Sequence, residues 1–573
     1  MNKSVPPNRR QFIGRVGSVT AASIAASAIG IKPLLGTDNA EASAIGPPSN
    51  QRALQAFNIR RDAAIAARQA TPSGLQHPTN PDDDLYPNKI GSYSKGLPHN
   101  ANGEVNINAY NSLIHALTTG NPADFNAIPM GTPAGASRRK LVSPQSGLAF
   151  DIEGPDSHSL IQPPAPALAS PEEGADIAEN YWMALLRDVP FSQYDSNPIA
   201  QDAAADLNLF GSAFKGPKRN GKNQLTGVTT ANLFRGLTLG DLRGPYLSQF
   251  FLLPCNFGAN GVNQQIRTSQ PGINYITDFA KWLEVQNGFA QGPDALDPVL
   301  RYMRNGRDIG QWVHIDVLFQ AYFQAFLVLA GLGAPFDNNN PYRLSPSQDG
   351  FATFGGPHIA TLLCEVSTRA LHAVWYQKWF VHRRLRPEVF AERCDRRLTV
   401  PGNTYPIDSE ILNSLQSATR LGKYFNGGNF FLPQAFPEGS PLHPSYGAGH
   451  ATVAGACVTI LKAWFRETTR ITDLLPHIGR TAPVVASDDG LSLLDYTGTD
   501  AADLTVGGEL NKIASNVANG RNIAGVHWRT DAIESLKLGE AIAISLLTEQ
   551  RPCYNETFNG FSLTKFDGTT ITV

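Results

Sequence analysis

The chain has 573 residues, which is long enough for two average domains or one large enzyme domain and excludes a short disulfide-stapled scaffold. Hydrophobic residues make up 42% and charged residues 17%, so we expect a folded chain with a large core. The formal net charge of −2 at pH 7 gives no electrostatic reason to expect a nucleic acid or an anionic membrane surface as a partner.

Residues 1–42 have the pattern of an export signal. Arg9 and Arg10 are adjacent, residues 16–31 carry no charge, and positions 40–42 read Ala-Glu-Ala, a small-x-small cleavage site. This pattern predicts a twin-arginine signal peptide and therefore a periplasmic or secreted protein. The alternative is an amphipathic helix or a membrane anchor. The uncharged stretch is too short for a comfortable span, so we expect no membrane span.

The remaining chain divides into an irregular part and a helical part. Residues 43–175 are rich in proline, with one helical stretch near 50–69, and we expect them to form an extension that serves as an oligomer interface. Residues 176–573 are expected to form the helical catalytic domain. Helical spacing recurs there at 176–188, 272–288, 309–332, 357–383, 408–420, 451–468 and 532–549.

Strand signals are sparse, and 396–400 and 561–573 are the best of them. Residues 312–331 and 451–465 are apolar on most faces, which predicts central helices surrounded by others. The sequence therefore predicts an all-α protein, a large helical bundle with long loops and little β-structure.

The first of three segments that carry chemistry ends a strong helical pattern. Lys378 and Arg386 are eight residues apart, which is about 80° beyond two full helical turns. If Pro387 ends the helix there, both cations lean toward one side. Taken alone, such a pair is more typical of a solvated helix end than of a site.

The second segment runs from His443 to His450, directly before an apolar helix. Gly447 and Gly449 let the backbone turn tightly, and the free N–H groups at a helix start attract an oxyanion.

The third segment contains Arg521, His527 and Asp531. The histidine and the aspartate are spaced i,i+4, so the carboxylate can hold one ring nitrogen and leave the other free to ligate or attack, although such a pair is also common in purely structural roles.

Together the three segments favour an oxyanion site. Lys378, Arg386 and Arg521 supply three cations, and Gly449 supplies a backbone donor. Two imidazoles remain, one for proton transfer and one for bonding to a central atom. A tetrahedral oxyanion such as phosphate or vanadate requires this set of groups.

The spacing K-x7-R-P, then P-S-x3-G-H, then G-R-x5-H-x3-D resembles the vanadium-dependent haloperoxidases, and in particular their algal bromoperoxidase branch. The export signal suggests a bacterial member. The resemblance implies a vanadate cofactor and a reaction in which hydrogen peroxide oxidises halide to a hypohalous acid equivalent, which halogenates small organic compounds. It also implies a homo-oligomer.

The resemblance also implies roles for individual residues. His527 would bind vanadium, and Asp531 would orient it, as helical geometry and the related phosphatases suggest. His450 would be the acid–base group, with His443 tuning proton transfer or halide approach beside it. The oxygens of vanadate would be held by Lys378, which also polarises bound peroxide, together with Arg386, Arg521 and the backbone N–H of Gly449.

One position departs from the pattern. The family usually has Ser-Gly-His where this chain has Ala448-Gly449-His450, so a hydroxyl expected to bond an oxyanion oxygen is missing. Ser445 and Tyr446 are close enough in sequence to replace it. Two other functions remain open from the residues: an acid phosphatase of the same superfamily, with a phosphorylated His527 and His450 as proton donor, and a non-catalytic oxyanion-binding protein.

Overall fold

The computed structural model describes residues 49–71, 74–132, 137–425 and 427–573, so the expected signal peptide lies outside the described residues. Residues 61–573 form one compact unit. A separate unit ends at Arg60, and its described residues belong to helix α2 (Ser49–Ala70). The described chain is mainly helical, with four short two-stranded sheets, which confirms the predicted fold class.

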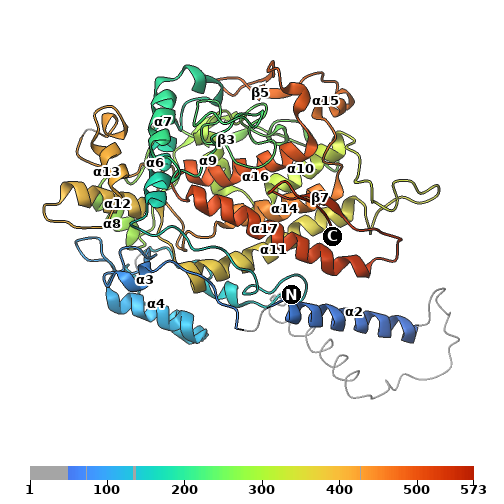
Figure 1. The fold of residues 1–573 in the computed structure, drawn as a ribbon, viewed down its shortest axis with the longest axis horizontal. Coiled ribbons are helices and arrows are strands. Elements are labelled where there is room, and N and C mark those ends of the chain that lie inside the picture. The colour runs from blue at the N-terminus through green and yellow to red at the C-terminus, as the bar shows by residue number, and fades with distance from the viewer. Residues whose placement is uncertain (1–48, 72–73, 133–136, 426) are drawn as a thin grey trace, which may run out of the picture. The chain divides into compact units, whose positions relative to one another are not determined.

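Helix α14 (Gly449–Trp464) is the central helix of the larger unit, as Figure 1 shows, and all its residues except His450 are buried. It packs against α17 (Arg529–Gln550), α11 (Gly356–Tyr376) and α16 (Val506–Ile523). Glycines permit the close approach of α14 and α17. A Cβ atom at Gly455 would lie 2.1 Å from the backbone oxygen of Leu536, so any side chain there would separate the helices.

The other α-helices surround this core (Figure 1). They are α3 (Asp82–Leu85), α4 (Ile107–Thr119), α5 (Pro122–Asn126), α6 (Pro171–Leu185), α7 (Pro198–Leu209), α8 (Phe279–Gln286), α9 (Gly306–Ile315), α10 (Gln320–Gly331), α12 (Pro387–Thr399), α13 (Ser409–Gln416) and α15 (Ile471–Leu474). The antiparallel two-stranded sheets pair β1 (Cys255–Phe257) with β2 (Asn260–Val262), β3 (Ile266–Ser269) with β4 (Leu296–Arg301), β5 (Val484–Ala486) with β6 (Leu493–Asp495), and β7 (Ser562–Thr564) with β8 (Thr570–Thr572).

The helix expected over 309–332 is two helices, α9 and α10, whose axes are bent by 104°. Asp316 ends α9 with extended backbone (φ −62°, ψ 153°), and four residues join the two helices. Among the described residues no single helix is long and apolar enough to cross a membrane. Taken together, α9 and α10 are long and apolar enough to span a membrane, but neither helix is so alone.

The prediction that Pro387 ends a helix was wrong. After α11 the chain makes a short π-helix, η4 (Gln377–His382), and Arg383 then takes a left-handed conformation with φ 42°. Arg386 is extended, and Pro387 is the first residue of α12, where its missing N–H costs nothing. The strand expected at 396–400 was also wrong, because those residues form the last turn of α12 and its cap.

The hairpin β7–β8 confirms the strand signal at 561–573. Helices α7, α12 and α16 were missed by the sequence pattern, as were α4 and α5 within the stretch expected to be irregular. Helix α16 combines glycine, asparagine and lysine with its apolar residues, so its period is weak although nearly all of it is buried. The division of the chain at residue 175 stays a prediction.

Candidate oxyanion site

The structure brings together residues of the second and third chemical segments around one cavity of about 260 Å³. His443 and Gly449 reach it from the second segment, and Arg521 and His527 from the third. His450, on the first turn of α14, completes this group. Other lining residues include Trp375, Phe436 and Asp316.

The two cations of the first segment lie beside this lining, fully buried. Arg386 Nη1 is 3.0 Å from Nε2 of His527, and its Nη2 is 2.9 Å from Nδ1 of His443. Lys378 donates through Nζ to the backbone oxygens of Pro444 and Ser445, at 2.8 and 2.9 Å. The first segment therefore meets the other two, although Arg386 caps α12 and does not share a helix with Lys378.

The three cations lack the partners that buried cations usually have. Within the described ranges, no carboxylate oxygen lies within 4.0 Å of Lys378, Arg386 or Arg521. Neighbouring buried arginines are paired: Arg384 contacts Asp531 at 2.7 Å, and Arg529 contacts Glu179. An uncompensated buried charge is costly, so three of them at one cavity indicate a site built for an anion.

Burial and mutual repulsion act on the titration of these cations. Desolvation, followed by the charge of Arg386, lowers the pKa of Arg521 to about 10. Desolvation likewise lowers the pKa of Arg386 to about 10 and holds the pKa of Lys378 well below its usual value, with Arg386 as the next cause. A bound anion would reverse these shifts, which is the linkage expected of an anion site.

His527 is oriented as a ligand. It lies in the turn between α16 and α17 and not on a helix, but Asp531, in the first turn of α17, still accepts from its Nδ1 at 2.8 Å. Burial, then the charges of Arg386 and Lys378, hold the pKa of His527 well below its usual range. A neutral ring that donates through Nδ1 presents a bare Nε2, which can coordinate a metal.

His450 has a carboxylate partner that the sequence pattern did not reveal. Its Nε2 donates to Oδ1 of Asp316 at 2.9 Å, at the break between α9 and α10. Burial lowers the pKa of His450, and Asp316 opposes this effect. Gly449 begins α14 beside it, and a side chain there would press on the ring of Trp375 at 3.2 Å.

Neither hydroxyl near Ala448 is free to replace the missing serine. Ser445 donates to Oδ2 of Asp531, and Tyr446 donates to the backbone oxygen of Pro163 at 2.9 Å. The backbone N–H of Ala448 itself donates to Ser535. The site therefore lacks one hydroxyl donor that the family pattern includes.

We expect Ala448→Ser to tighten vanadate binding. A hydrogen bond to a charged group contributes about 1.5–3 kcal/mol, which corresponds to roughly 10–100-fold in affinity. Equilibrium dialysis of vanadate against the wild-type and variant proteins measures the change. Equal dissociation constants would mean that another donor already satisfies that oxygen.

These features define a helical-bundle protein with a buried cationic site for a tetrahedral oxyanion and a histidine positioned to bond its central atom. The model of the VCPO second helical-bundle domain matches residues 363–555, which include every predicted site residue.

Relatives that match most of the chain are vanadium-dependent bromoperoxidases. The vanadium-dependent bromoperoxidase of Corallina pilulifera is 37% identical over 86% of this chain and 93% of its own length. The vanadium-dependent bromoperoxidase of Ascophyllum nodosum is 36% identical over 89% of this chain and 90% of its own length. The homohexameric second vanadate-dependent bromoperoxidase of Ascophyllum nodosum superposes with a TM-score of 0.84 at 31% identity, covering 94% of this chain and 93% of that one. The chain belongs to the vanadium-dependent bromoperoxidase family, as the motif spacing predicted.

Proposed function

We propose that this protein uses hydrogen peroxide to oxidise halide, with vanadate bound in the described cavity, and releases a hypohalous acid equivalent that halogenates small organic compounds. The observation that carries this proposal is the set of three buried cations without carboxylate partners beside the bare Nε2 of His527.

The donor set fits vanadate. His527 would ligate vanadium through Nε2, and Lys378, Arg386, Arg521 and the Gly449 N–H would hold the oxygens. When bound, vanadate supplies a Lewis acid that activates peroxide without a change of its own oxidation state. A negative group at this position would also remove the cost of burying three unpaired positive charges.

The chain's own residues supply orientation and proton transfer. Asp531 keeps the proton of His527 on Nδ1, so that Nε2 stays available to ligate. His450, held by Asp316, is placed to take and return a proton at the cavity. Arg386 donates toward His443, which fixes that ring at the cavity wall, and Trp375 lies against it with a centroid separation of 4.8 Å.

Two assays on the same protein test the proposal. Vanadate-dependent bromination of monochlorodimedone with hydrogen peroxide is expected, and hydrolysis of p-nitrophenyl phosphate is not. Phosphate hydrolysis without bromination would favour the phosphatase alternative. Vanadate binding without either activity would favour a non-catalytic oxyanion-binding protein.

The pairing of His450 with Asp316 predicts a pH effect. A carboxylate at hydrogen-bond distance stabilises the imidazolium, so Asp316→Asn should lower the pKa of His450 further, by about one pH unit or more. Whichever protonation state of His450 is active, the limb that it sets in the profile of kcat/KM against pH moves to lower pH. Measurement of that profile for both proteins tests the assignment, and an unmoved limb would contradict it.

We propose further that the protein is exported by the twin-arginine pathway and is a bacterial member of the family. The support is the Arg9-Arg10 pair followed by an uncharged stretch and a cleavage pattern. Replacing both arginines by lysine should retain the protein in the cytoplasm of a bacterial host, as fractionation would show.

We also propose a homo-oligomer in which residues 43–175 contribute the interface. Light scattering of the full-length protein measures its oligomeric state, and a monomer would contradict the proposal.

A further inference from the structure

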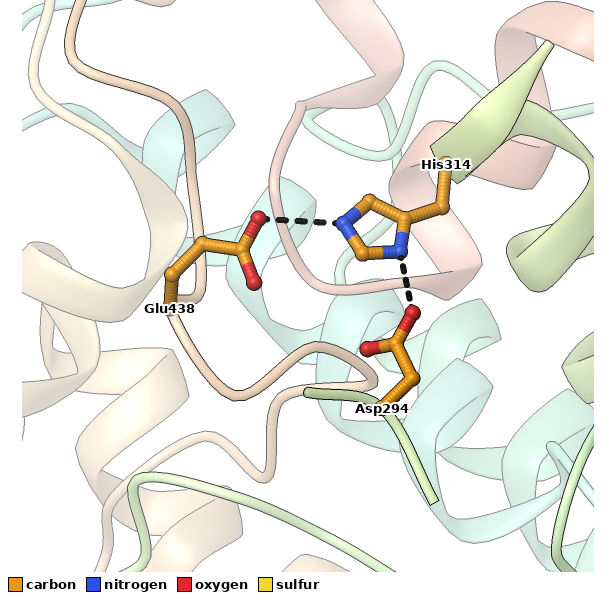
Figure 2. A group of neighbouring side chains, drawn as sticks. All are labelled: Asp294, His314 and Glu438. Carbon is orange, nitrogen blue, oxygen red and sulfur yellow. Dashed lines mark hydrogen bonds and ion pairs between the residues drawn. The ribbon is translucent and has the colours of Figure 1, made fainter. Parts of the chain in front are cut away.

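The wall of the cavity carries a second set of titratable side chains. Figure 2 shows the ring of His314 between the carboxylates of Asp294 and Glu438. Nδ1 lies 3.0 Å from Oδ2 of Asp294, and Nε2 lies 3.0 Å from Oε1 of Glu438. Each ring nitrogen therefore has a carboxylate oxygen at hydrogen-bond distance, so the two contacts hold the ring from two directions. We call these three residues the His314 clamp.

The clamp is not arranged as a metal site, although its ligand atoms lie within 4.8 Å of one another. The two carboxylates meet opposite nitrogens of the ring (Figure 2), whereas a metal needs groups that converge on one point and a bare ligating nitrogen. Arg139 also lies 3.7 Å from Oε1 of Glu438, where it would repel a cation.

The clamp joins three separate segments of the chain. Asp294 precedes β4, His314 is in the last turn of α9, and Glu438 lies in the loop that leads to His443. Burial acts to raise the pKa of Glu438, but the contacts with His314 and the charge of Arg139 together lower it to about 2. The ring of His314 also stacks on that of Phe436, with centroids 3.7 Å apart and planes 8° apart.

The guanidinium group of Arg521 contacts two residues next to His314, Val313 and Phe436. Its Nη1 donates to the backbone oxygen of Val313, the residue before His314, at 2.8 Å. Its guanidinium carbon lies 5.5 Å from the centroid of Phe436, the ring on which His314 stacks. Its Nε has no hydrogen-bond partner among the described residues. Both groups that contact this cation therefore adjoin His314: Val313 precedes it in α9, and the ring of Phe436 stacks on its ring.

We propose that His314, held between Asp294 and Glu438, is a positioning residue that fixes Arg521 in the geometry needed to hold the oxyanion. This inference rests on the proposed function, because it concerns the same site. Groups that orient a ligand set through hydrogen bonds commonly change affinity by roughly 10–100-fold when they are removed.

The first test is vanadate affinity, measured by equilibrium dialysis of the full-length protein freed of vanadate. His314→Gln should raise the dissociation constant by about tenfold or more. His372→Gln is the matched control, since His372 is also part-buried and contacts a carboxylate, Asp151, at 3.0 Å. The control should bind vanadate within about twofold of the wild type.

Substitution of Asp294 or Glu438 distinguishes a positioning role from a purely electrostatic one, because the two roles predict opposite changes in vanadate affinity. Removing a negative charge near an anion site strengthens anion binding by Coulomb's law alone. A clamp predicts the opposite, so Asp294→Ala and Glu438→Ala should each weaken vanadate binding by about tenfold. Tighter or unchanged binding would overturn the inference.

Folding of each variant is checked by circular dichroism and thermal unfolding. If an alanine variant does not fold, Asp294→Asn and Glu438→Gln replace it. These variants lose the charge and keep one acceptor oxygen, so weaker binding still supports the clamp, and tighter or unchanged binding overturns it. A wild-type protein that binds no vanadate would instead overturn the proposed function, which keeps the two failures distinct.

Discussion

His527→Ala is expected to abolish vanadate binding and to reduce vanadate-dependent bromination by about 10³-fold or more. The ring is fully buried, is held by Asp531 through Nδ1, and has Nε2 3.0 Å from Arg386. Alanine removes the imidazole that would ligate vanadium and leaves Nη1 of Arg386 without this partner. Dialysis for vanadate affinity and the monochlorodimedone assay measure the two losses.

The control for this prediction is again His372→Gln, which changes a part-buried histidine outside the cavity. The folded state of His527→Ala is verified by its thermal unfolding curve, because a destabilised protein would lose activity for a different reason. Residual bromination within about tenfold of the wild type would mean that another group at the cavity, such as His443 or His450, binds vanadium instead.

The structure brings the predicted site residues together, whereas several of the elements that carry them differ from the prediction. The motif residues lie in three short segments, and each segment reports its own local geometry, such as a glycine turn before a helix at Gly449. The break between α9 and α10 was missed because apolar residues continue through it. Periodicity measures burial along one segment, and it does not detect a change of axis at Asp316.

The partners of the site residues were the least predictable part. Asp316 is 134 positions from His450, and Glu438 is 124 positions from His314. Such pairs form because tertiary packing places two buried polar groups together, and no local spacing encodes them. One available signal was the polar interruption of an apolar helix by His314 and Asp316, since a buried polar residue needs a partner.

Asp531 is the residue at which the site and the fold depend most directly on one another. Its Oδ2 accepts from Nδ1 of His527 and from the hydroxyl of Ser445, and its Oδ1 accepts from Arg384 at 2.7 Å. All four side chains are buried. Arg384 also contacts Glu173, so it joins Asp531 to the first turn of α6.

Asp531→Ala is therefore expected to destabilise the protein by about 3–5 kcal/mol, because it breaks a buried ion pair and leaves His527 and Ser445 without an acceptor. Denaturant unfolding at equilibrium measures this loss. Vanadate affinity should fall with it, since without Asp531 the proton of His527 is no longer held on Nδ1 and the ring is free to turn.

Asp531→Asn separates the two consequences. The amide keeps the size of the side chain and one acceptor oxygen, but it loses the charge that pairs with Arg384. We expect an intermediate loss of stability, of about 1–3 kcal/mol, and a clear loss of vanadate affinity. If the asparagine variant lost stability but bound vanadate as the wild type does, Asp531 would serve the fold alone, and another group would have to orient His527.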